Sequence, residues 1–308
     1  MLCLEGRDRQ RTRAIVTLLH GNEPSGVRAL HAWLRGKEMP VVNVIFFVGA
    51  IDAALAPPGF AYRMLPGCRD LNRCFRPPWD GPQGAIAGEA LRLLRESGCE
   101  AMVDLHNNTG HNPAYGVGTR LDAASVNLTA LFAERYVRTS LRLGALIEAT
   151  AEDFPSITVE CGRANDPDAD AIALAGLRRY VLVDAIETRR VLAAPMAVFD
   201  DPVRVTLAHG IRLGIGARPV PGADLTLAED IDRHNFQPVM PGMLLGWLGT
   251  RRQWPIEARG ADGQDVSADV FEARDGTLVT RRGIVPIMMT TDPVVAAADC
   301  LFYIVREA

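Results

Sequence analysis

Metal-binding and acid–base side chains follow three short apolar runs of the chain. In order, these are His20 and Glu23 after Ala14–Leu19, His106 after Ala101–Leu105, and Glu160 after Ile157–Val159. The His-x-x-Glu pair and one imidazole from a neighbouring run would form a set of two histidines and one carboxylate. Such a set suits a catalytic zinc ion, because three protein ligands leave the fourth tetrahedral position open for water. A further carboxylate nearby could serve as a general base.

The segments that would position these residues have the pattern of an α/β domain. The apolar runs are short and nearly continuous, as in buried parallel strands, and segments with helical periodicity separate them. This alternation predicts a largely parallel sheet covered by helices on both faces, with its site at the carboxyl ends of the strands. Beyond the three runs above, we expect a strand at 41–48 and helices beginning near Val27 and at about 84–97, 125–150 and 167–190.

The pattern changes near residue 195. From there the chain contains short strand-like runs separated by Gly, Pro and Asp, and no helical pattern longer than about ten residues. These runs are 203–207, 211–215, 243–248, 277–280 and 284–289. We therefore predict an α/β domain over residues 1–195 and a β-rich domain over residues 196–308.

Composition excludes several classes of protein. The 308 residues include 33 basic and 37 acidic side chains, for a net charge of −4, and no basic block that would bind nucleic acid. Six scattered cysteines without a Cys-x-x-Cys pair do not form a disulfide framework. No secretory signal and no membrane-spanning stretch is visible. We expect a cytoplasmic protein without nucleic-acid or membrane partners, and a homo-oligomer is compatible with this pattern.

Four motifs resemble the succinylglutamate desuccinylase/aspartoacylase family, a branch of the zinc carboxypeptidase-like fold. They are His20-Gly-Asn-Glu23-Pro-Ser-Gly26, Asp70-Leu-Asn-Arg73-Cys-Phe75, Asp104-Leu-His106-Asn107 and Ile157-Thr-Val-Glu160-Cys-Gly162. A weaker similarity over residues 235–246 resembles the C-terminal β domain of the family. The resemblance implies a three-layer α/β domain with a mixed, mostly parallel sheet, followed by the smaller β-rich domain.

The resemblance also implies a role for each residue of the predicted site. His20, Glu23 and His106 would bind one zinc ion per chain. Glu160 would act first as general base and then as general acid. A structural salt bridge is the competing interpretation of Glu160, because an unpaired carboxylate after a buried strand is costly.

Five further residues take their roles from the second motif and the residues before it. By the resemblance, Asn72 and Arg73 hold the substrate carboxylate, although Arg73 could instead be a buried ion-pair partner. Asp70 would orient a metal-binding imidazole, that of His20. Arg63 would polarise the scissile carbonyl. Its spacing to the motif is two residues longer than in aspartoacylases, so Arg69 is the alternative.

The predicted function is zinc-dependent hydrolysis of the amide bond in a small N-acylated amino acid or related amine. Two alternatives remain: a zinc metallocarboxypeptidase that acts on peptide C-termini, and a non-catalytic binding protein, against which an intact Glu160 argues. Aspartoacylases carry a further arginine about ten residues before the catalytic glutamate. The matching stretch 149–156 has no basic residue and contains Glu152 and Asp153. We therefore expect N-acetylaspartate to be a poorer substrate than acylated amino acids with neutral or basic side chains.

Overall fold

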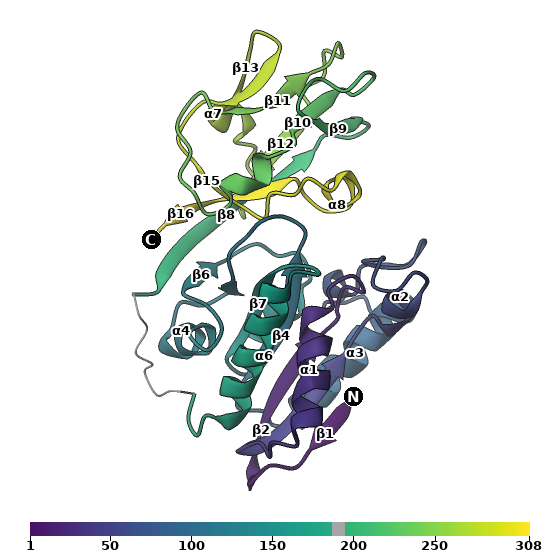
Figure 1. The fold of residues 1–308 in the computed structure, drawn as a ribbon, viewed down its shortest axis with the longest axis vertical. Coiled ribbons are helices and arrows are strands. Elements are labelled where there is room, and N and C mark those ends of the chain that lie inside the picture. Colours follow the sequence, from purple (N-terminus) through teal and green to yellow (C-terminus); the bar gives the residue numbers. More distant parts are fainter. Residues whose placement is uncertain (187–194) are drawn as a thin grey trace. The chain divides into compact units, whose positions relative to one another are not determined.

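The computed structural model describes residues 1–186 and 195–308, which form two compact units. The first unit comprises Met1–Asn107 and Ala114–Val198, and the second comprises Asn108–Pro113 and Phe199–Ala308 (Figure 1). Residues 193 and 194, beside the predicted boundary, lie outside the described residues. The division into residues 1–195 and 196–308 therefore stays a prediction.

Seven strands of the first unit form one sheet in the order β1-β3-β2-β4-β7-β5-β6. Strand β2 runs parallel to both β3 and β4, and β5 runs parallel to β6. Strand β1 pairs antiparallel with β3, and β5 pairs antiparallel with β7. The sheet is therefore mixed and mostly parallel, as predicted. Its strands are β1 (Leu2–Leu4), β2 (Asp8–Thr17), β3 (Val42–Val48), β4 (Met102–Asn108), β5 (Tyr115–Gly118), β6 (Arg135–Arg138) and β7 (Ser156–Arg163).

Helices cover both faces of this sheet (Figure 1). Successive residues of β2 point to opposite faces, so Ile15 packs with Trp33 and Leu177 on one face, whereas Val16 packs with Leu91 on the other. Helices α1, α4 and α6 supply the first face, and α3 and α5 supply the second. The helices are α1 (Ser25–Gly36), α2 (Ile51–Leu55), α3 (Gly81–Glu96), α4 (Ala123–Thr129), α5 (Leu146–Thr150) and α6 (Pro167–Leu182), with a 3-10 turn η1 (Leu71–Arg73).

The second unit is rich in β structure, as predicted. Strand β8 pairs with β12 and β16, β16 pairs with β15, and a separate sheet has the order β13-β14-β11-β10-β9. Its strands are β8 (Ala197–Leu207), β9 (Leu213–Gly216), β10 (Leu225–Ala228), β11 (Leu244–Leu248), β12 (Ile256–Arg259), β13 (Phe271–Arg274), β14 (Thr277–Thr280), β15 (Val285–Ile287) and β16 (Phe302–Glu307). Its helices are short: η2 (Ile231–His234), α7 (Ser267–Val270) and α8 (Pro293–Ala298).

The predicted helix at 125–150 is wrong. The structure divides this segment into α4, the strand β6 and the short helix α5. Tyr136 is completely buried where β6 pairs with β5, and Gly144 adopts a φ of +83°, which an α-helix does not accept. Strand pairing therefore overrides the local helical pattern. The predicted helix at 167–190 is present as α6 but ends at residue 182; residues 183–186 are not helical, and 187–190 lie outside the described residues.

None of the helices in the described parts of the chain is long and apolar enough to cross a membrane.

Candidate metal and active site

The turn after β2 positions His20 and Glu23. Helix α1 begins close to the sheet because Gly26 has no side chain; a Cβ there would lie 2.1 Å from Thr17 Oγ1. The backbone N–H of Glu23 donates to the carbonyl of His20 at 3.2 Å. This tight turn brings the imidazole and the carboxylate to the same side, beside the end of β4.

The Glu23 carboxylate lies between the two predicted imidazole ligands. Its Oε1 is 2.8 Å from His20 Nδ1, and its Oε2 is 2.7 Å from His106 Nδ1. One ligand atom from each of the three residues lies within 4.8 Å of the others, and all three side chains are buried. The structure therefore brings together the three residues that the sequence predicted as metal ligands.

A second carboxylate lies beside the opposite nitrogen of each imidazole. Asp70 Oδ1 lies 3.2 Å from His20 Nε2, in the place predicted for it. Asp104 Oδ2 lies 2.8 Å from His106 Nε2, and Asp104 is completely buried. No role was predicted for Asp104. Its signal was its position two residues before His106 on one strand, because residues i and i+2 share a face.

This donor set fits a divalent metal ion. Metal-binding imidazoles commonly donate their second N–H to a carboxylate, which fixes the ring and its tautomer. Here both Nδ1 atoms face Glu23, and Asp70 and Asp104 lie behind the rings. Burial alone would lower the pKa of His106, but the adjacent carboxylates of Asp104 and Glu23 outweigh it and raise the pKa well above its usual value. The buried carboxylates of Glu23 and Asp104, together with the half-buried Asp70, thus create a demand for positive charge that a cation would meet.

Arg63 reaches the cluster, whereas Arg69 does not. Arg63 donates from Nε and Nη2 to Asp70 Oδ2 at 3.0 and 2.9 Å, and its Nη1 lies 3.8 Å from Glu23 Oε1. Arg69 donates instead to the carbonyl of Asp80 in an exposed position. Of the two alternatives, only Arg63 is placed where it could contact a substrate carbonyl.

Asn72 and Arg73 lie beside Asp70 on η1. The backbone N–H of Asn72 donates to Asp70 Oδ1 at 2.8 Å, and its side-chain Oδ1 accepts from the backbone N–H of Leu146 at 3.0 Å. Arg73 Nη1 donates to the carbonyl of Asn72 at 2.9 Å. The amide oxygen of Asn72 is therefore engaged by the chain itself, and its amide nitrogen is the end that could donate to an anion.

Glu160 lies on β7 and is buried close enough to the cluster to be influenced by its charges. Burial raises the pKa of Glu160 to about 8, against the opposing positive charge of His106. Its Oε2 has no hydrogen-bond partner among the described residues, and no ion pair with a basic side chain is found for it in residues 1–186 and 195–308. The salt-bridge interpretation of Glu160 is therefore not supported.

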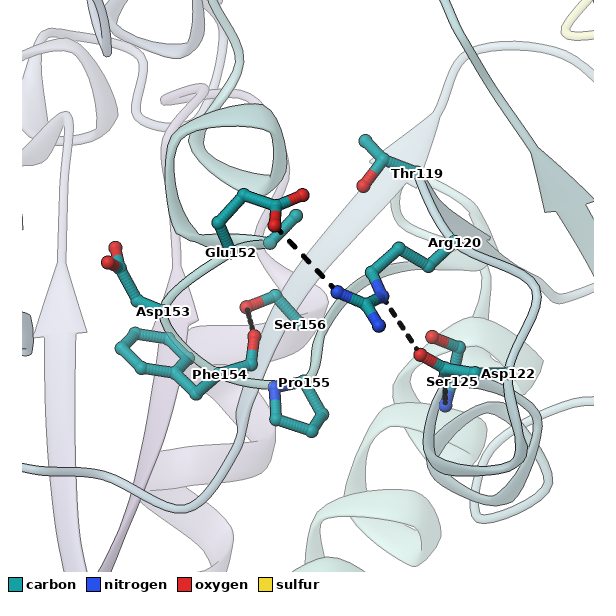
Figure 2. Close-up of a pocket in the computed structure, with 10 residues that line it drawn as sticks. Thr119, Arg120, Asp122, Ser125, Glu152, Asp153, Phe154, Pro155 and Ser156 are labelled. Carbon is teal, nitrogen blue, oxygen red and sulfur yellow. Dashed lines mark hydrogen bonds and ion pairs between the residues drawn. The ribbon is translucent and has the colours of Figure 1, made fainter.

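Glu152 and Asp153 lie away from this cluster. Figure 2 shows them in a separate pocket with Arg120, Phe154 and other residues. Asp153 pairs with Arg95 at 2.8 Å, and Glu152 Oε2 lies 3.9 Å from Arg120 Nη1. This pocket is at the amino end of β7, about 13 Å along the strand from Glu160. The expectation that their charges repel a second anionic group of the substrate is therefore wrong.

Solved structures share the fold over nearly the whole chain. A product-bound ectoine utilization protein EutE (DoeB) from Ruegeria pomeroyi is 18% identical with a TM-score of 0.61, covering 97% of this chain and 86% of that chain. The succinylglutamate desuccinylase from Chromobacterium violaceum is 14% identical with a TM-score of 0.63, covering 99% and 88%. Murine aminoacylase 3 is 17% identical with a TM-score of 0.59, covering 98% and 97%. Comparison with curated proteins gave no match.

A family model identifies the first unit directly. The succinylglutamate desuccinylase/aspartoacylase catalytic domain matches residues 9–174, which is more than half of the chain. That range contains the candidate metal-binding cluster of His20, Glu23 and His106, the Asp70 motif and Glu160. The chain therefore belongs to the succinylglutamate desuccinylase/aspartoacylase family of hydrolytic deacylases.

Proposed function

We propose that this protein is a zinc-dependent deacylase that hydrolyses the amide bond of a small N-acylated amino acid or related amine. The observation that carries the proposal is the buried His20–Glu23–His106 cluster beside Glu160 in a chain of this family. Two imidazoles and one carboxylate are typical ligands of a catalytic zinc ion. One zinc ion per chain would be held by these three residues.

The proposed chemistry divides between the metal and the protein. The chemistry that zinc supplies when bound is Lewis acidity, which polarises a carbonyl and makes water a stronger acid. Glu160 accepts a proton from the water that attacks the acyl carbon and returns it to the leaving nitrogen. Burial of the site excludes bulk water, so charges within it act more strongly than at the surface.

The cationic side chains would orient the substrate. Arg63 donates to the acyl oxygen as negative charge develops on it, and Asp70 holds the guanidinium in place for this purpose. Arg73 and the amide nitrogen of Asn72 bind the carboxylate of the amino acid product. A preference for neutral or basic over acidic amino acid side chains stays a prediction, because residues 149–156 lie at the amino end of β7, away from the site.

The test compares substrate classes at equal zinc loading. We expect N-acetyl amino acids to be cleaved with a kcat/KM at least about tenfold above that of short peptides with free C-termini. The panel should include neutral and basic N-acetyl amino acids together with N-acetylaspartate. A preference for peptides would support the metallocarboxypeptidase alternative instead. Hydrolysis of neither class by zinc-loaded protein would support a non-catalytic binding protein.

A further inference from the structure

A single buried amide side chain joins the three segments that carry the ligand cluster and Glu160. Asn107 is 2% exposed and directly follows His106 on β4. Its Nδ2 donates to Ser25 Oγ at 2.9 Å and to the carbonyl of Gly162 at 3.1 Å, and its Oδ1 accepts from the backbone N–H of Ser25 at 3.0 Å. Its own backbone N–H donates to Glu23 Oε2 at 3.2 Å.

Each of these contacts lies close in sequence to a residue of the site. Ser25 comes two residues after Glu23, and Gly162 comes two residues after Glu160. Because two residues of backbone leave little freedom, fixing Ser25 and Gly162 also fixes the neighbouring carboxylates. We propose that Asn107 is a positioning residue that sets the separation between the metal ligands and Glu160; this inference rests on the proposed function.

The hydrogen-bond pattern permits only one orientation of the Asn107 amide. Ser25 Oγ donates its hydrogen to Asp170 Oδ1 at 2.5 Å, so it can only accept from Asn107. The carbonyl of Gly162 is also an acceptor, whereas the backbone N–H of Ser25 is a donor. Nδ2 must therefore face Ser25 Oγ and Gly162, and Oδ1 must face the Ser25 N–H. A carboxylate at position 107 would place an oxygen against two acceptors, although its size is the same.

The experiment uses the full chain and variants of nearly equal size. Asn107→Asp removes both hydrogen bonds that Asn107 Nδ2 donates. Ser25→Ala removes only the one to Ser25 Oγ and leaves the Asn107 side chain unchanged. Asn43→Asp is the matched control, because Asn43 accepts from the Gly6 N–H and donates to the carbonyl of Arg9 at the amino end of β3. For each protein, zinc affinity is measured by competition with a chelator. Thermal stability is measured as well, and kcat and KM are measured for an N-acetyl amino acid at full zinc loading.

We expect Asn107→Asp to bind zinc about tenfold or more weakly, as removal of residues that support metal ligands usually does. At full zinc loading, kcat should fall by about tenfold while KM changes less than about twofold, because Asn72 and Arg73 lie on another segment. Ser25→Ala should show the same changes to a smaller extent. Asn43→Asp should lose stability but keep the zinc affinity and kcat of the unmodified protein.

Two results would overturn the positioning role: wild-type zinc affinity and kcat in Asn107→Asp, or an equal loss of zinc affinity in Asn43→Asp. If Asn107→Asp does not fold, unchanged zinc affinity and kcat in Ser25→Ala would overturn it. An unmodified protein that binds zinc but hydrolyses no N-acetyl amino acid would overturn the proposed function instead. The zinc affinities of the variants would still decide whether Asn107 positions the ligands.

Discussion

The carboxyl group of Glu160 is buried, and its Oε2 makes no hydrogen bond with any described residue. No hydrogen bond to this atom therefore offsets the free-energy cost of burying it. Buried polar groups without partners are rare in folded proteins because each one raises the free energy of the folded state. Such groups are found most often at functional sites, where the missing partner is a substrate or a reacting water. The position of Glu160 beside the imidazoles is consistent with that role.

Replacing Glu160 with Gln should separate turnover from metal binding. The amide keeps the shape of the carboxyl group but cannot accept a proton, so we expect kcat to fall by about 10² or more. Zinc content should stay at the wild-type level, because Glu160 is not a proposed ligand. Glu152→Gln, in the pocket of Figure 2, is the control and should leave kcat unchanged. Near wild-type turnover in Glu160→Gln would remove this residue from the mechanism.

Asp70 and Asp104 offer a matched pair of substitutions. Each carboxylate lies against the Nε2 atom of one imidazole, so Asp70→Asn and Asp104→Asn should each weaken zinc binding by about 10- to 100-fold. Only Asp70 also holds Arg63. At full zinc loading, kcat should therefore be lower in Asp70→Asn than in Asp104→Asn. Equal kcat values in the two fully loaded variants would show that the contact with Arg63 has no catalytic role.

At the scale of elements, the close approach of α1 to the sheet determines where the turn that carries His20 and Glu23 lies. Gly26, in the first turn of α1, faces Thr17 Oγ1 and Leu105 Cβ; an added Cβ would lie 2.1 and 2.9 Å from these atoms. Gly36, at the other end of the same helix, has only the end of the Arg178 side chain nearby, at 3.8 Å. The two glycines therefore differ in packing although they share one helix.

Gly26→Ala should lower the free energy of unfolding by about 1–3 kcal/mol, because the new methyl group displaces the helix from the sheet. It should also weaken zinc binding, since Glu23 lies only three residues before it. Gly36→Ala should instead raise stability by about 0.5–1 kcal/mol, as Ala does at open helical positions. Denaturant unfolding and zinc competition measure both effects. Equal stability of the two variants would contradict this account of the turn.

The residues that meet at the site could be predicted, but the exact ends of β4 and β7, which extend beyond His106 and Glu160, and the packing between elements could not. Apolar runs followed by His20, His106 and Glu160 predicted which residues meet, because parallel strands end at one edge of the sheet. Strand β6 could not be predicted, since its pairing with β5 overrides a helical local pattern. The position of Glu152 and Asp153 could have been predicted, because they precede the strand at 157–159 whereas Glu160 follows it, and the site was expected at the carboxyl ends of the strands.

At the scale of the whole molecule, the chain leaves the first unit at Asn107, directly after His106, and returns to it at Ala114. Residues 108–113 are held by the second unit: Thr109 Oγ1 donates to Thr290 Oγ1 at 2.7 Å, and the Met288 N–H donates to Asn112 Oδ1 at 3.0 Å. These partners are more than 170 residues apart in sequence. Contacts at such separation leave no periodic or spacing signal, so the whole segment was predicted to belong to the first domain.

The central claim is that this family member is a zinc-dependent deacylase, and a zinc titration tests it most directly. Protein stripped with a chelator should not hydrolyse N-acetyl amino acids, and activity should return in proportion to added zinc with an end point near one ion per chain. In His106→Ala, activity should not return when zinc is added under the same conditions. Full activity in metal-free protein, or recovery that is unaffected by loss of His106, would contradict the account.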